Sequence, residues 1–235
     1  MSGQFEYEER YAVSDPASTR LALEDFGFTL KGNETQTDHW FIPNYIMSPT
    51  EQAQWFDYDK GYALRLREQS SGDHLRVFIT SKQLLRPADH SVMINNEADL
   101  TAEGMRRTLV PIGSEFDEVI QKLTAYSNEY PLSLDEAKNL IENAGRKDYI
   151  VIHKQRSTFL HAELPEIVAD LDNIPALEDT DLGFSACIEL EYKGPGSPDE
   201  AKKAVRGISS QLGYKQEKIL AMALPGLAIK YLAVF

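Results

Sequence analysis

Cysteine is almost absent from this sequence. Cys187 has no second cysteine with which to form an internal disulfide, and this shortage is typical of a reducing compartment, so we expect a cytoplasmic protein. The residue stands in an apolar stretch. It is therefore expected to be a small buried side chain and not a reactive thiol.

Long apolar runs are also absent. No segment approaches the roughly 18 apolar residues of a membrane-spanning helix, and residues 1–4 have neither the basic nor the apolar region of a signal peptide. We therefore expect no membrane partner. Apolar residues nevertheless make up 42% of the 235 residues, which is enough to build the core of a single domain over residues 1–235.

Positive charge is scarce. The chain has 24 Lys and Arg against 37 Asp and Glu, and its formal net charge is −13. Binding to nucleic acid depends on a basic surface, so we expect no nucleic-acid partner. An anionic small molecule is still possible, but it would need a local cluster of basic residues or bound metal ions.

Common catalytic arrangements are missing too. We find no Ser/His/Asp or Cys/His constellation and no Gly-rich phosphate loop. The histidines lack metal-ligand spacing and are expected to be structural or exposed; they are His39, His74, His90, His153 and His161. Trp40, Trp55 and Tyr58 could stack on a base or a thiazole-type ring, although packing in the core or at a rim is the simpler interpretation.

What the sequence does contain is a set of strands and helices with clear boundaries. Strands are expected over 5–11, 35–42, 62–69, 74–82, 91–94, 148–172 (as a meander) and 183–193. Helices are expected over 17–26, 100–109, 114–126, 133–144 and 197–212, the last two with capping boxes. Residues 43–61 read as a loop with a short helix near 50–56, and the apolar tail 224–235 is expected to pack on the body.

The first strand carries an unusual charge pattern. Because side chains alternate between the faces of a strand, Glu6, Glu8 and Arg10 share one face. Two carboxylates held this close repel each other, and a hard cation such as Mg²⁺, which prefers carboxylate oxygens, would explain them. Glu189 and Glu191 form the same pattern near the other end of the chain.

Like-charged residues are sorted by strand throughout the chain. Basic side chains share a face at Arg65 and Arg67, at Arg76 and Lys82, and at Lys154 and Arg156, whereas acidic ones do so at Asp170 and Asp172. A solvated sheet face usually mixes signs, although each pair alone could still be such a face. If these faces point into a closed antiparallel barrel, a polyanion held by the bases and by carboxylate-bound metal ions would compensate both kinds of charge.

The motifs, taken in order, resemble the CYTH domain, or triphosphate tunnel metalloenzyme family, which includes thiamine triphosphatases, inorganic triphosphatases and class IV adenylyl cyclases. Glu6-Tyr7-Glu8-Glu9-Arg10 is similar to the family's N-terminal Glu-x-Glu-x-Lys strand, with Arg10 in place of the lysine. The later motifs are Arg65-Leu66-Arg67, Thr80-Ser81-Lys82, Lys154-Gln155-Arg156, Asp170-Leu171-Asp172 and Glu189-Leu190-Glu191. Asn95-Asn96-Glu97 and Lys230 are looser matches.

The resemblance implies an α+β fold: a closed eight-stranded antiparallel β-barrel that forms a tunnel, with flanking helices. It implies a triphosphate bound by Arg10, Arg65, Arg67, Lys82, Lys154 and Arg156. It also implies Mg²⁺ or Mn²⁺ on Glu6, Glu8, Asp170, Asp172, Glu189 and Glu191, and catalytic roles for Glu8, Arg10 and Lys82.

The expected activity is metal-dependent hydrolysis of tripolyphosphate or of an organic triphosphate such as thiamine triphosphate. Formation of cyclic AMP from ATP and non-catalytic binding of polyphosphate or nucleotides are the alternatives. The identity of the triphosphate, the number of metal ions and the oligomeric state stay open at this point.

Overall fold

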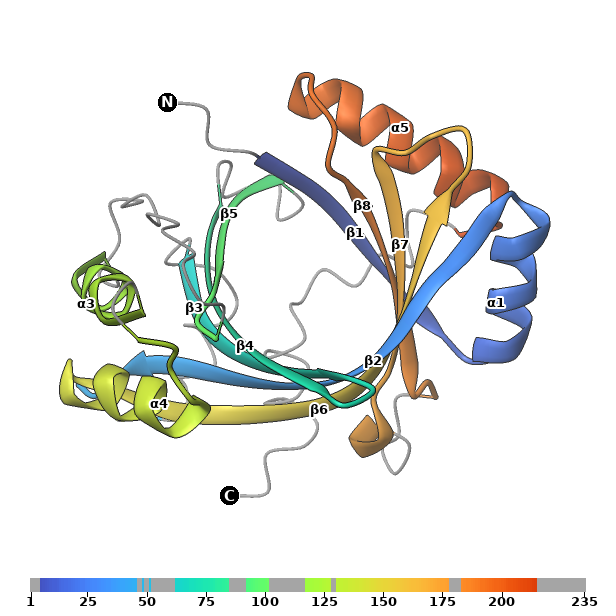
Figure 1. The fold of residues 1–235 in the computed structure, drawn as a ribbon. Coiled ribbons are helices and arrows are strands. Elements are labelled where there is room, and N and C mark those ends of the chain that lie inside the picture. Colours follow the sequence, from blue (N-terminus) through green and yellow to red (C-terminus); the bar gives the residue numbers. More distant parts are fainter. Residues whose placement is uncertain are drawn as a thin grey trace.

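Eight antiparallel strands form one strongly curved sheet, with helices on its outer side (Figure 1). The computed structural model describes residues 5–45, 62–84, 92–101, 117–127, 130–177 and 183–214, with Ser48 and Glu51. The strands are β1 (Phe5–Val13), β2 (Phe28–Pro43), β3 (Tyr62–Ser71), β4 (His74–Leu84), β5 (Val92–Asp99), β6 (Arg146–His161), β7 (Ile167–Asn173) and β8 (Ala186–Tyr192). The helices are α1 (Pro16–Asp25), α3 (Asp117–Ser127), α4 (Leu134–Asn143), the 3₁₀ turn η1 (Pro175–Leu177) and α5 (Pro198–Gln211).

The strands follow the order β1-β5-β4-β3-β2-β6-β7-β8, and β1 pairs with β8 as well as with β5. We refer to this curved sheet as the barrel. The ladder between β1 and β8 runs from Tyr7 to Val13, whereas the ladder between β1 and β5 covers only Phe5, Glu6 and Tyr7. The predicted eight antiparallel strands with flanking helices are therefore confirmed, and β5 meets β1 over the shortest ladder.

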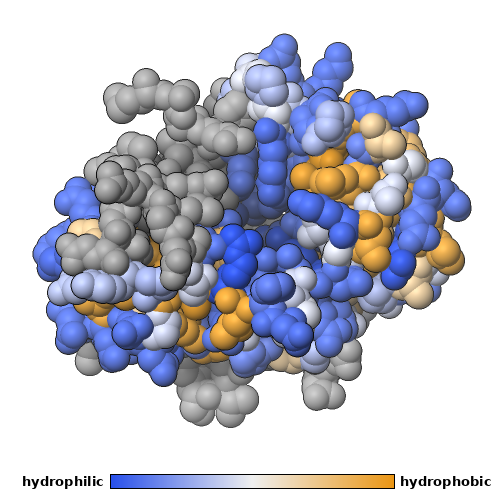
Figure 2. Space-filling model, in the orientation of Figure 1, coloured by the Kyte–Doolittle hydropathy of each residue, from blue (hydrophilic) through white to orange (hydrophobic). Residues whose placement is uncertain are grey.

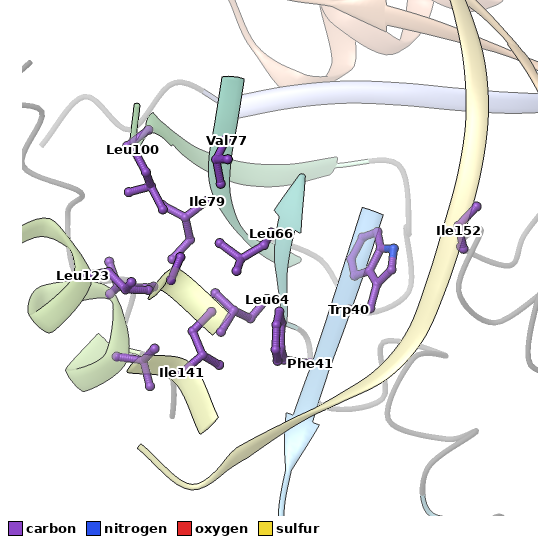
Figure 3. Packing of buried hydrophobic residues seen from close by; sticks show 14 of the residues in the cluster. Trp40, Phe41, Leu64, Leu66, Val77, Ile79, Leu100, Leu123, Ile141 and Ile152 are labelled. Atoms are coloured by element: carbon purple, nitrogen blue, oxygen red, sulfur yellow. The ribbon is translucent and has the colours of Figure 1, made fainter. Parts of the chain in front are cut away.

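Most of the hydrophobic core lies outside the barrel, in two clusters beneath the helices. In the first, Leu64 and Leu66 of β3 pack with Ile79 against Leu123 of α3 and Ile141 of α4 (Figure 3). Leu64 and Leu66 flank Arg65 along the strand, so their side chains point to the opposite face from the arginine. Packing the apolar face against α3 and α4 thus turns the charged face of β3 inwards.

The second cluster lies where α1 and α5 cover β1, β7 and β8 (Figure 1). Tyr7 and Tyr11 of β1 and Leu190 of β8 are buried there with Leu23 of α1 and Val205 of α5. These apolar residues alternate with the acidic residues of β1 and β8. The same packing therefore directs Glu6, Glu8, Glu189 and Glu191 into the barrel.

Local signals set the helix ends as predicted. The Ser133 and Ser197 side chains cap α4 and α5, and Glu136 and Glu200 complete the two capping boxes. Asp15 caps α1 by accepting hydrogen bonds from the backbone N–H groups of residues 17 and 18.

Strand boundaries differ from the sequence predictions at three places. β2 begins at Phe28 and not at Thr35, β5 extends to Asp99, and the segment predicted as a meander consists of one long strand, β6, followed by β7. Residues 102–109 of the predicted helix 100–109, all but Glu51 of the short helix near 50–56, and the tail 224–235 lie outside the described residues. Among the described helices, none is long and apolar enough to cross a membrane. The face shown in Figure 2 is mainly hydrophilic, with hydrophobic residues in separate patches.

Candidate functional site

Carboxylates from three neighbouring strands meet inside the barrel. In the β1–β8 ladder Glu8 lies opposite Glu191 and Arg10 opposite Glu189, and in the β7–β8 ladder Asp170 lies opposite Glu189. Two groups follow from this register, and within each group the ligand oxygens lie within 4.8 Å of one another. The first group is Glu6, Glu8 and Glu191, and the second is Asp170, Glu189 and Glu191.

Two of these carboxylates hold protons more tightly than usual. Burial, reinforced by the nearby charge of Glu191, raises the pKa of Glu6 to about 7. Burial and the charge of Glu191 likewise raise the pKa of Asp170 to about 6, against the opposing effect of Arg156. A site whose carboxylates repel each other in this way fits a divalent cation, because the cation would neutralise both groups.

Arg156 links the basic strand β6 to carboxylates of β7 and β8. Its guanidinium donates to Asp170, Asp172 and Glu189, each at 2.6 Å. Burial tends to raise the pKa of Glu189, but the charges of Arg10 and Arg156 outweigh burial and hold it well below the usual value. Asp172 also accepts from Lys154 at 2.7 Å and belongs to neither carboxylate group, so its role as a metal ligand stays a prediction.

The three predicted catalytic side chains lie together. The ammonium of Lys82 donates to Glu8 at 3.0 Å and lies 3.9 Å from Glu6. Arg10 donates through Nε to Glu189 at 2.8 Å and through Nη2 to Glu8 at 3.5 Å. The register of β1 and the reach of Lys82 from β4 thus bring the basic side chains onto the carboxylates.

The remaining predicted phosphate ligands lie on β3 and β6, on either side of β2. Arg65, Arg67, Lys154 and Arg156 are all buried. Asp38 of β2 lies between them and accepts two hydrogen bonds from Arg67, at 2.6 and 2.9 Å. Sequence reasoning did not include Asp38 in the site, because it has no acidic neighbour two residues away that would have marked it.

Other residues near the site were missed as well. Lys193, just beyond β8, lies 2.5 Å from Glu191. Glu97 of β5 accepts from the Thr80 hydroxyl at 3.0 Å and lies 3.5 Å from Arg65, which agrees with the loose match made for this strand. Glu9 points to the outer face of β1, where Tyr7, Tyr11 and Arg206 donate to it.

The interior becomes apolar beyond the charged residues. Trp40 lies two residues after Asp38 on β2, and Cys187 lies two residues before Glu189 on β8, so both side chains point to the inner face. Both are buried in the first hydrophobic cluster together with Ile152. The Arg65 guanidinium lies over the Trp40 ring, 5.3 Å from its centroid. The predictions of a buried Cys187 and of core packing for Trp40 are confirmed; Trp55 and Tyr58 lie outside the described residues.

The histidines of the described residues lie away from the carboxylate groups. His39 is hydrogen-bonded to Asp148 at 2.8 Å, His153 to Thr37 at 3.1 Å, and His161 to the backbone carbonyl of Phe26 at 3.1 Å. His74 is exposed, and His90 is not among the described residues. Hydrogen bonding within the fold accounts for His39, His153 and His161.

Comparisons with known proteins show the fold. Neither a protein-family model nor a curated protein matches this sequence. The PH1819 protein of Pyrococcus horikoshii is similar in structure, with a TM-score of 0.63 and 16% sequence identity over 96% of this chain and 98% of that one. The PH1012 protein of the same organism gives a TM-score of 0.59 and 18% identity over 93% and 96%.

A candidate adenylate cyclase from Vibrio parahaemolyticus is similar as well, with a TM-score of 0.60 and 16% identity over 97% of this chain and 99% of that one. At these identities the likeness shows a shared fold and leaves the activity to be argued from the site. The likeness to these structures agrees with the eight-stranded fold that the sequence motifs led us to expect.

Proposed function

We propose that the charged interior of the barrel is a metal-dependent triphosphate site and that this protein hydrolyses a triphosphate. The observation that carries the proposal is the pair of carboxylate groups that share Glu191, with Arg10, Lys82 and Arg156 in direct contact with them. An acidic chain gains nothing for a neutral or cationic ligand by burying five basic side chains and half-burying a sixth, Arg10. A polyanion held together with metal ions uses both sets of charges.

The proposal includes membership of the CYTH family and a barrel that is closed as a tunnel. The order of the six motifs along the chain supports the family. The pairing of β1 with both β8 and β5 supports closure. The fold shared with a candidate adenylate cyclase agrees with both.

Mg²⁺ or Mn²⁺ on the carboxylate groups would neutralise phosphate charge and help to position the attacking water. The basic side chains would bind the phosphate oxygens, Arg65, Arg67 and Arg156 through their planar guanidinium groups. Lys82 and Arg10 would hold phosphate beside the carboxylates. Arg10 is always charged, because Glu189 and Glu8 raise its pKa despite burial, so its role is binding and orientation and not proton donation.

The test is a product analysis with tripolyphosphate, thiamine triphosphate and ATP, in the presence of Mg²⁺ or Mn²⁺. We expect metal-dependent release of phosphate from at least one of the three. Folded protein that releases no phosphate from any of them would contradict the proposal.

Cyclisation of ATP is the second candidate, favoured by the fold shared with the Vibrio protein. Cyclic AMP and diphosphate, and not ADP and phosphate, would then be the products in the same assay. Saturable binding of a triphosphate without any product would favour the third alternative, a binding module. Arg10 is the sequence feature that supports this alternative, because an arginine cannot act as a general acid.

A further inference from the structure

An acidic side chain lies in the part of the barrel where the motifs predict only basic ones. β2 pairs with β3 on one side and β6 on the other, so its inner face lies between the two basic strands. Asp38 is opposite Arg67 in the β2–β3 ladder and is only 1% exposed. Its neighbours on the same face, Gln36 and Trp40, carry no charge.

Three of the proposed phosphate ligands converge on this one carboxylate. Arg67 binds it in the two-bond geometry that arginine also uses for phosphate, with Nε at 2.6 Å and Nη2 at 2.9 Å. Arg65 Nη1 lies 3.5 Å and Lys154 Nζ 3.8 Å from Oδ2 of Asp38. The carboxylate thus occupies donors that a phosphate group would use.

Two of the three cations have other anchors. Arg65 donates through Nη2 to the Thr80 hydroxyl at 3.0 Å, and Lys154 donates to Asp172 at 2.7 Å. Asp38 is therefore not required to hold Arg65 and Lys154 in place. What it adds is a negative charge, and burial does not remove that charge, because Arg67, Arg65 and Lys154 hold the pKa of Asp38 far below its usual value.

We propose that Asp38 is a built-in anion that competes with incoming phosphate groups for Arg65, Arg67 and Lys154, and that it thereby limits how many phosphate groups the barrel accepts. This inference rests on the proposed function, because it assigns a specificity role within the proposed phosphate site. Replacing the carboxylate with a neutral group of the same shape opens these donors to substrate.

The test is calorimetric titration of Asp38→Asn with diphosphate and with tripolyphosphate in the presence of Mg²⁺. We expect tripolyphosphate to bind at least about tenfold tighter than to the unaltered protein, because a like charge next to the ligand has been removed. The gain should be smaller for diphosphate, which has one phosphate group fewer to place near β2.

Asp148→Asn is the matched control. It makes the same change in net charge and breaks the pairing of a carboxylate with Lys138, at 2.8 Å, and with His39. Asp148 is opposite Phe41 in the β2–β6 ladder, on the outer side of the barrel, so its removal should leave both affinities unchanged.

Thermal unfolding gives a second measurement: the rise in melting temperature on adding tripolyphosphate, which would not increase if Asp38 had only a structural role. Asp38→Asn leaves buried cations without their carboxylate, so its melting temperature should fall without ligand and should rise more with tripolyphosphate than that of the unaltered protein. Unchanged or weaker binding of tripolyphosphate by a folded Asp38→Asn would overturn the inference.

A crystal structure of the unaltered protein with tripolyphosphate and Mn²⁺ tests the same point even if Asp38→Asn does not fold. Competition requires Arg67 to bind a phosphate oxygen in place of Asp38. An intact Asp38–Arg67 pair beside bound tripolyphosphate would overturn the inference. If Asp38→Asn binds tripolyphosphate more tightly but neither protein hydrolyses tripolyphosphate, thiamine triphosphate or ATP, competition stands and the proposed hydrolysis fails. If neither protein binds any of these three triphosphates, both proposals are overturned.

Discussion

The carboxylates inside the barrel differ in how their charge is compensated. Asp172 and Glu189 accept hydrogen bonds from Arg156, and the pKa of each is lowered by neighbouring cations in spite of burial. Glu6 and Asp170 instead have raised pKa values, because burial and the charge of Glu191 favour their neutral forms. The surplus of negative charge is thus concentrated around Glu191, which belongs to both carboxylate groups.

Glu191→Gln should therefore be the most damaging single change at the proposed metal site. Loss of a partner that merely orients a metal ligand costs roughly 10- to 100-fold in activity or metal affinity, and we expect a shared ligand to cost at least roughly 100-fold in kcat/KM. Steady-state phosphate release and a Mn²⁺ titration would measure the two effects.

Glu9→Gln is the control on the outer face of β1. Glu9 accepts from the hydroxyls of Tyr7 and Tyr11, each at 2.5 Å, and from Arg206 at 2.8 Å. Its replacement should lower the free energy of unfolding by roughly 1–3 kcal/mol and leave Mn²⁺ affinity unchanged. Equal loss of metal affinity in both variants would show that β1 had been disturbed generally and would remove the support for Glu191.

Glu6→Gln should stabilise the metal-free protein at pH 8. The folded pKa of Glu6, about 7, lies above the ordinary value of 4.5, so this group favours folding below about pH 4.5 and loses that contribution as pH rises to about 7. Since one pKa unit corresponds to about 1.4 kcal/mol, the gain from the neutral amide should be on the order of 1–3 kcal/mol. Denaturant unfolding at pH 8 and pH 5 measures it; a gain at pH 5 equal to that at pH 8 would contradict this electrostatic account.

At this scale the sequence indicated most of the inner residues but not all of their partners. Paired charges at alternate positions reveal a charged strand face, as for Arg65 and Arg67. A single charge on an uncharged face, such as Asp38, carries no such signal. That Asp38 lies opposite Arg67 depends on the pairing of β2 with β3, which no short sequence pattern specifies.

Among the elements, the turn between β8 and α5 is held by a close approach at Gly194. A Cβ at this position would lie 2.7 Å from Glu166 Cβ and from the Tyr192 ring and hydroxyl, and that hydroxyl donates to the Pro195 carbonyl at 2.6 Å. Glycine is therefore required at this turn, which positions α5 against β1 and β8.

Gly194→Ala should lower the free energy of unfolding by about 1–3 kcal/mol, because the methyl group overpacks the turn. Gly207→Ala is the control within α5, because a Cβ at this position would meet nothing within 4 Å. It should raise the free energy of unfolding by about 0.5–1 kcal/mol, because alanine has a higher helix propensity than glycine. Chemical denaturation compares the pair, and a Gly194→Ala variant as stable as the unaltered protein would contradict the close-packing argument.

Element predictions succeeded where a local signal exists. The capping boxes at Ser133 and Ser197 correctly predicted the starts of α4 and α5. The first half of β2 was missed because Gly32 and Asn33 are typical of a turn. In the fold they are paired with β6, and the register shifts between Leu30 and Gly32, so an irregular ladder accommodates them.

For the whole molecule, the arrangement is inverted relative to an ordinary small barrel: the apolar faces of the strands pack outwards against helices, and the charged faces point inwards. Burying so many charges costs stability unless they are paired. The ion pairs across β1, β6, β7 and β8 supply that pairing in the protein itself, and ligands would have to exchange with them.

Metal binding should depend on pH for the same reason. Glu6 and Asp170, with pKa values of about 7 and about 6, must lose their protons before a cation binds, so Mn²⁺ affinity should rise from about pH 5.5 and level off above about pH 8. Calorimetry in buffers of different ionisation enthalpy would count the protons released. An affinity that stays constant from pH 5.5 to 8 would contradict this assignment.

The central claim is that metal ions and triphosphate share one site inside the barrel, and the most direct test is the affinity for tripolyphosphate with and without Mn²⁺. If Glu191 and its neighbours hold the metal beside Arg10 and Arg156, binding should saturate at one tripolyphosphate per chain. It should also be about 5- to 150-fold tighter with Mn²⁺, the usual range for coupled ligands. Equal affinity with and without the metal, or no binding at all by folded protein, would contradict the account.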